Sequence, residues 1–166
     1  TVVDEIADKM GAERIGQCEK HDTGVSFYGV YYGQAALPMP AETIKYLTSD
    51  ILDNCIVTNY ETGKKTTIYD MEKAYGKDPY QMFLSGSISL MTIENPNATT
   101  DKELVIFRDS FGSSITPLLV EGYAKITLVD IRYINPDYLG RFVNFEGSDI
   151  LFLYSTLVLN NSETIK

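Results

Sequence analysis

A serine at a strand-to-helix junction is the feature of this sequence best suited to chemistry. The apolar run at residues 104–107 predicts a buried strand, residues 108–112 a tight turn, and the apolar pattern over 115–119 a helix. Ser110 would then lie over the carboxyl edge of a sheet, beside backbone N–H groups that open a helix. A hydroxyl nucleophile and the oxyanion it creates both need such surroundings.

The neighbours of Ser110 suggest how the turn would work. With Ser110 as the nucleophile, the backbone N–H groups near Phe111 and Gly112 are the candidate oxyanion donors. Asp109 is poorly placed to act as the base of its neighbour, so we expect it to accept backbone N–H bonds at the turn. The structural alternative is that Ser110, like the polar residues around it, only caps the following helix.

A second polar pair follows the next predicted strand. Asp130 and Arg132 lie two residues apart, directly after residues 125–129. In one interpretation, Arg132 reaches across the sheet edge to hold an anion or support an oxyanion near Ser110. In the other, Asp130 is a turn residue and Arg132 an ordinary surface side chain.

A base for Ser110 is hard to find. A serine hydroxyl is a weak nucleophile at its free pKa, so a base, normally a histidine, must activate it. His21 is the only histidine, and the polar residues 19–24 predict an exposed loop. We therefore expect His21 to lie away from Ser110, and a hydrolase complete within this chain is the least favoured functional alternative.

The last third of the chain predicts the elements that would position these residues. Strands at 104–107, 125–129 and 150–154 alternate with helices at 115–121 and 136–144, the order of a parallel βαβαβ sheet. We expect the three strands to be adjacent and parallel, with both helices on one face. Their carboxyl ends would meet at one edge, where open α/β sheets bind ligands.

The first part of the chain predicts a β-rich portion with short helices. Its expected elements are a helix at 2–10, an extended tyrosine-rich segment at 25–35, a short helix at 42–46, a hairpin of 56–60 with 66–69, helical pieces at 70–75 and 79–84, and a strand at 88–93.

Composition limits the function classes. The chain has 166 residues, of which 44% are hydrophobic and 22% charged, as in a globular domain with a full core. A net charge of −9 without a basic cluster argues against nucleic acid and anionic membrane surfaces as partners. No membrane-spanning run, signal peptide or metal-ligand spacing is present. Cys18 and Cys55 fit a single disulfide or, as we favour, two separate buried thiols.

Five segments, from about Phe27 to Ser155, resemble the DHHW family of exported Firmicute proteins, relatives of the SGNH-like domains of the alginate O-acetyltransferase group. In order they are SFYGVYYGQA, KDPYQMFLSG, ELVIFRDSFGSS, ITLVDIRY and DILFLYS. The resemblance maps Ser110 onto the family's DSY or DSF serine, and Asp130 and Arg132 onto its acidic–arginine segment. It implies an α/β fold: a partial SGNH-like (flavodoxin-like) three-layer sandwich with a parallel sheet and a β-rich N-terminal portion.

The sequence departs from the family in one respect. The Asp-x-His of the Asp-His-His-Trp signature is missing, and no tryptophan occurs. The opening segment TVVDEIADKMG resembles the helix that follows this signature. The resemblance therefore implies that residues 1–166 are one SGNH-like domain whose Asp and His belong to a segment preceding Thr1.

These observations predict an extracellular or cell-envelope protein that hydrolyses or transfers acyl esters on a polysaccharide without a cofactor. Ser110 would be the nucleophile and Arg132 a supporting cation, and the chain alone would be inactive. The alternative is a non-catalytic envelope binding or scaffold domain that keeps the fold without the chemistry.

Overall fold

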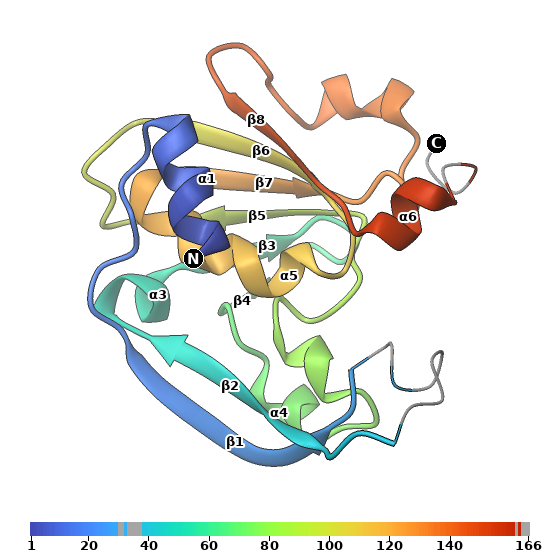
Figure 1. Ribbon diagram of the computed structural model, residues 1–166. Helices are drawn as coiled ribbons and strands as arrows, with labels where there is room; N and C mark the ends of the chain where they lie inside the picture. The colour runs from blue at the N-terminus through green and yellow to red at the C-terminus, as the bar shows by residue number, and fades with distance from the viewer. Residues whose placement is uncertain (30–31, 33–37, 162, 164–166) are drawn as a thin grey trace.

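A mixed six-stranded sheet in the order β4-β3-β5-β7-β6-β8 forms the centre of the molecule (Figure 1). The computed structural model describes residues 1–29, 32, 38–161 and 163. The strands of this sheet are β3 (Ile56–Asn59), β4 (Lys65–Thr66), β5 (Leu90–Glu94), β6 (Glu103–Arg108), β7 (Lys125–Val129) and β8 (Asp149–Leu153). β6 pairs in parallel with both β7 and β8, which confirms the three adjacent parallel strands. The other pairs are antiparallel, so the sheet as a whole is mixed rather than parallel.

Short helices surround this sheet. They are α1 (Val2–Met10), α3 (Asp50–Asn54), α4 (Met71–Ala74), η1 (Pro79–Met82), α5 (Gly112–Ile115), η2 (Thr116–Gly122), η3 (Pro136–Arg141) and α6 (Thr156–Asn160). The predicted helix at 2–10 is confirmed, with Thr1 as its N-cap and Gly11 ending it at φ 58°. Within the part of the chain that the structure describes, no helix is both long and apolar enough to cross a bilayer.

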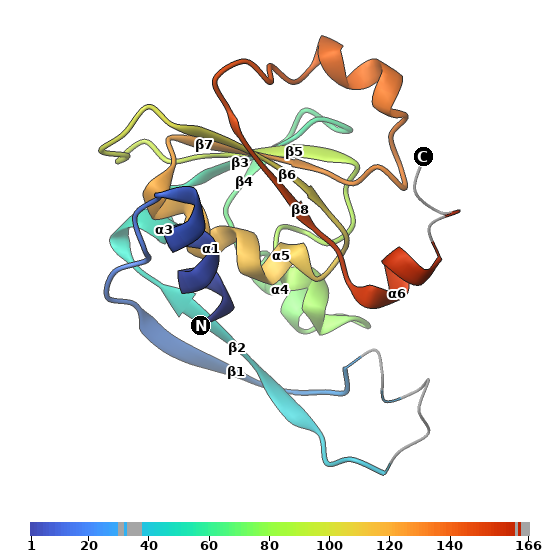
Figure 2. The ribbon, with the colours of Figure 1, turned by 45° about the horizontal axis from the view of Figure 1, so that its top comes forward.

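The two faces of the sheet are covered by different helices (Figure 2). Leu104 of β6 belongs to the main core cluster, together with Leu119 of η2 and residues of α1 and α3. Val105 faces the other way and packs in a second cluster with Leu139 of η3. The expectation that both connecting helices share one face was therefore wrong. The chain steps from β6 to β7 and then back across β6 to β8, and right-handed crossovers in opposite directions place their helices on opposite faces.

This change of direction has a consequence for the site. The loop after β6 leads to helices on one face, and the loop after β7 leads to η3 on the other. The point where the loops of adjacent parallel strands part in this way is a common place for ligand binding in α/β sheets. Ser110 and Asp130 follow β6 and β7 at this point of the sheet.

A separate two-stranded ribbon forms the β-rich N-terminal portion. β1 (Glu19–Phe27) and β2 (Glu42–Thr48) pair antiparallel and run outside the main sheet (Figure 1). The short helix expected at 42–46 was wrong, because Ile44 alternates with polar neighbours and is buried against Met82 and Phe83. The extended segment expected at 25–35 is strand only to Phe27. Residues 30–31 and 33–37 lie outside the described residues.

Most other expected elements of this region are present. β3 and β4 form the predicted hairpin, α4 and η1 lie within the expected helical pieces, and β5 begins two residues later than predicted. Cys18 and Cys55 are free thiols, which agrees with the favoured expectation of two separate cysteines. Cys18 is half-buried and Cys55 is buried. Burial raises the pKa of Cys55 to about 11.

Candidate functional site

The polar ends of the three parallel strands meet at one edge of the sheet. Asp109 lies directly after β6, and its Oδ2 accepts a 2.7 Å hydrogen bond from the backbone N–H of Ser155, which follows β8. Asp130 follows β7 and acts electrostatically on Arg108, the last residue of β6. The structure thus brings these three segments together at the edge that the sequence predicted.

Asp109 shapes the turn that presents Ser110. Its side chain is buried, and its Oδ1 accepts a 2.9 Å hydrogen bond from the N–H of Phe111. Together with the bond from Ser155, this agrees with the predicted role of Asp109 as an acceptor for backbone N–H groups. The N–H of Gly112 donates to the Asp109 carbonyl at 3.1 Å. Both candidate oxyanion donors, Phe111 and Gly112, are therefore already used within the turn, contrary to expectation.

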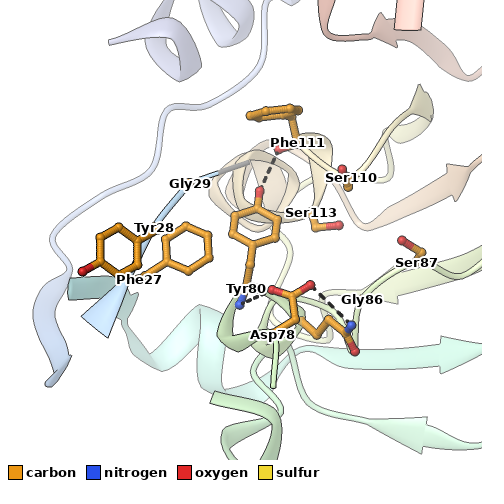
Figure 3. A pocket seen from close by; sticks show the side chains of 11 residues that line it. Phe27, Tyr28, Gly29, Asp78, Tyr80, Gly86, Ser87, Ser110, Phe111 and Ser113 are labelled. Atoms are coloured by element: carbon orange, nitrogen blue, oxygen red, sulfur yellow. Dashed lines mark hydrogen bonds between the residues drawn. The ribbon is translucent and has the colours of Figure 1, made fainter. Parts of the chain in front are cut away.

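The Ser110 hydroxyl borders a cavity of about 400 Å³ beside this turn. Ser110 is half-buried, and its hydroxyl has no hydrogen-bond partner among the described residues. The lining residues come from the ribbon, from η1 and the loop after it, and from the β6–α5 turn. They are Phe27, Tyr28, Gly29, Asp78, Tyr80, Gln81, Gly86, Ser87, Ser110, Phe111 and Ser113 (Figure 3). Its size is that of a small-ligand site.

Aromatic rings form one wall of this cavity and hydroxyl groups another. Phe27 and Tyr80 stack with ring centroids 6.2 Å apart. The hydroxyl of Tyr80 donates to Ser114 Oγ at 2.9 Å, which ties η1 to α5. Burial raises the pKa of Tyr80, so its hydroxyl stays protonated at neutral pH. Figure 3 shows the hydroxyl-bearing Ser87, Ser110 and Ser113 away from the rings of Phe27 and Tyr28.

Arg108 is a fully buried cation next to this cavity, and the sequence did not point to it. Its side chain has no exposed area, and a Cβ on Gly112 would lie 2.7 Å from its Cβ. A glycine at 112 therefore lets the turn pass close over the arginine stem. Burial lowers the pKa of Arg108, while Asp130 and Asp109 favour its charged form. The only sequence signal was a glycine four residues after a strand-end arginine.

Asp130 and Arg132 form a close ion pair. Arg132 Nε donates to Asp130 Oδ1 at 2.8 Å, and Nη2 donates to Oδ2 at 2.6 Å, a two-point contact. Asp130 is fully buried and the Arg132 side chain is 20% exposed. The hydrogen bonds from Asp130 raise the pKa of Arg132. Arg132 is thus bound to Asp130, and no hydrogen bond of the described residues joins it to Ser110.

His21 has partners of its own, away from the turn. It lies in β1 and is half-buried, so the expected exposed loop was wrong. Its Nε2 is 2.8 Å from Thr48 Oγ1, and its ring stacks on Tyr46 with centroids 5.1 Å apart. No contact of His21 with Ser110 occurs among the described residues. As expected, His21 lies away from Ser110.

Comparisons with known proteins place the fold. No known protein family and no curated protein matches the sequence. Among solved structures, a DHHW family protein from Eubacterium siraeum matches with a TM-score of 0.73 and 19% identity over 98% of this chain. Bacillus cereus PatB1 matches with TM-scores of 0.66, in a structure with a sulfonyl adduct, and 0.65. These two matches are 18% identical and each cover 95% of this chain.

These likenesses show that the chain has a DHHW-like fold. The chain spans 57% of the length of the Eubacterium siraeum protein, and 55% and 57% of the two PatB1 chains. The matched part includes the strands that position Ser110, since it covers nearly all of the present chain.

Proposed function

We propose that this chain carries the nucleophile of a serine-dependent acyl-transfer site, acting in ester hydrolysis or O-acyl transfer on an extracellular or cell-envelope polysaccharide. The proposal depends on Ser110, which borders the cavity beside the turn after β6 and whose hydroxyl makes no hydrogen bond among the described residues. The fold likeness to PatB1, which one structure shows with a sulfonyl adduct, supports a reactive site of this kind.

In this proposal the base comes from polypeptide outside these 166 residues. The chain has one histidine, and that histidine pairs with Thr48. The part of the Eubacterium siraeum structure without a counterpart here is large enough to hold a further segment of the fold. Such a segment, with the Asp-x-His of the DHHW signature, would take the proton from Ser110 as its oxygen attacks an acyl carbon.

The test compares two lengths of the protein on small acetyl esters. We expect the 166-residue chain to show negligible turnover, because a serine without its base loses most of its activation. A longer protein that includes an upstream Asp-x-His segment is expected to be active, and Ser110→Ala in that protein should abolish turnover while its melting temperature stays unchanged. Strong Ser110-dependent turnover by the short chain would show that a base within it was missed.

A non-catalytic binding domain is the second candidate function. It is favoured by the N–H groups of Phe111 and Gly112, which bond within the turn rather than pointing into the cavity. A longer protein that stays inactive on varied acyl donors would support this alternative over the enzyme.

A further inference from the structure

The buried guanidinium of Arg108 is held by few and long contacts. Nη1 donates to Ser113 Oγ at 3.2 Å and to the Asp109 carbonyl at 3.4 Å, and Nη2 donates to the Ile88 carbonyl at 3.5 Å. Nε is buried and has no hydrogen-bond partner among the described residues. A charged donor left unpaired in a protein interior is unfavourable, so this arrangement calls for an explanation.

The nearby carboxylates do not explain it, since they bind other groups. Asp130 holds Arg132 by two hydrogen bonds, and both oxygens of Asp109 accept backbone N–H groups. No carboxylate of the described residues lies within ion-pair distance (4.0 Å) of Arg108. The positive charge of Arg108 is therefore not neutralised by a direct ion pair with a described carboxylate.

Ser113 connects this charge to the cavity. The Ser113 oxygen accepts a hydrogen bond from Arg108, so the hydroxyl must direct its own proton elsewhere. Ser113 also lines the cavity beside Ser110, and a bond from a cation makes its hydroxyl a stronger donor. Ser113 can thus offer a polarised O–H to a ligand in the cavity.

A strained turn places a second hydroxyl on the same wall. Leu84, Ser85 and Gly86 have consecutive positive φ values of 53°, 59° and 92°, which is unfavourable for the two non-glycine residues. The Ser85 carbonyl accepts a 2.8 Å bond from Lys73 Nζ, which holds the turn in place. Ser87 follows directly, and Figure 3 shows its hydroxyl directed toward Ser113.

We propose that Ser113 and Ser87, with the Arg108 guanidinium behind Ser113, form an oxyanion-binding subsite next to Ser110. The proposal rests on the function proposed above. It supplies the oxyanion donors that the turn lacks, because the N–H groups of Phe111 and Gly112 are occupied. When Ser110 Oγ bonds to an acyl carbon, the carbonyl π pair moves onto the oxygen. The subsite holds that negative oxygen while the serine proton goes to the external base. When the carbonyl re-forms and the bond from the acyl carbon to the leaving oxygen breaks, the base returns this proton to the leaving oxygen, which departs as the alcohol.

Methanesulfonate binding tests the subsite without requiring any reaction. It is a small anion whose single negative charge is shared by three oxygens, and dimethyl sulfone has nearly the same shape without the charge. We expect the chain to bind methanesulfonate in an NMR titration, with shifts at Ser113 and Ser87, and to bind dimethyl sulfone at least about tenfold more weakly. A net charge of −9 gives the protein no general attraction for anions, so binding would report the local site.

Variants assign the binding to residues. Ser113→Ala should raise the Kd for methanesulfonate by about tenfold, whereas Ser114→Ala on the same helix, whose hydroxyl bonds to Tyr80, should leave it unchanged. Arg108→Met should weaken binding similarly, Arg108→Lys less, and the double variant Ser113→Ala with Arg108→Met little more than either alone, because the two residues act as one unit.

Ser110→Ala separates this proposal from the proposed function. It should retain methanesulfonate binding, so the subsite can be confirmed even if Ser110 is shown not to be a nucleophile. Absence of binding to the wild-type chain, or an unchanged Kd in Ser113→Ala, would overturn the subsite. Neither result would decide whether Ser110 is a nucleophile, because that role is tested by turnover of acetyl esters.

Discussion

At the scale of single residues, Asp109 holds the turn that presents Ser110. Its two carboxylate oxygens fix the turn at Phe111 and tie it to Ser155 after β8. Asp109→Ala would leave both N–H groups without an acceptor, and we expect the free energy of unfolding to fall by about 2–4 kcal/mol. Asp109→Asn keeps one acceptor oxygen and should lose less.

Urea denaturation followed by circular dichroism measures this difference. Asp101→Ala, in an exposed loop, serves as the control and should stay within about 0.5 kcal/mol of the wild type. If Asp109→Ala were as stable as the control, the carboxylate would not be holding the turn.

The local sequence was sufficient to predict the role of Asp109 but not the burial of Arg108. An aspartate between a strand and a helix has one common use, to accept nearby N–H groups, and that use is intrinsic to the local chain. The buried guanidinium of Arg108 donates to Ser113 and to the Ile88 carbonyl, and Ile88 lies 20 residues away in sequence. Packing between such distant segments cannot be predicted from the pattern of residue types around Arg108. The occupied N–H groups of Phe111 and Gly112 were missed because the turn geometry had to be known first.

At the scale of elements, the strands of the last third were predictable and their covering helices were not. Apolar runs between turn residues mark β6, β7 and β8. The faces of η2 and η3 depend on the spatial order β7-β6-β8, which sequence order alone does not fix. β2 was mistaken for a helix because its apolar residues are few, and its pairing with β1 across a long connection leaves no local signal.

β8 also yields a prediction, since it is an edge strand with apolar side chains in water. Phe152 is 67% exposed, Ile150 is 46% exposed, and Phe152 stacks on Phe107 at 4.9 Å. An unpaired edge with such side chains favours association between chains. We expect Phe152→Lys to weaken self-association about tenfold or more, because it places a charge on the edge, as measured by sedimentation velocity over a concentration series.

Tyr75→Lys is the matched control, because Tyr75 is 69% exposed and lies after α4, away from β8. It should leave self-association as in the wild type. Equal effects of the two substitutions would show that added charge, and not the β8 edge, controls association.

At the scale of the whole molecule, three parallel strands, a change of crossover direction and a cavity together place Ser110 where a ligand can reach it. The alternation of strands and helices in the last third predicted the three parallel strands, whereas the mixed character of the whole sheet was not predicted. The cavity was not predictable, because it joins the ribbon, η1 and the β6–α5 turn, which are distant in sequence. Most of the fold thus follows from local patterns, whereas the site follows from contacts between separate elements.

In the proposed function, Ser110 is a nucleophile whose base lies outside these 166 residues. Mass spectrometry of the chain treated with phenylmethanesulfonyl fluoride, with and without added imidazole, tests this most directly, because imidazole can replace a missing histidine and the modified residue is identified. We expect modification at Ser110, faster with imidazole and absent in Ser110→Ala. Modification spread over many serines, or equal in the wild type and Ser110→Ala, would contradict it.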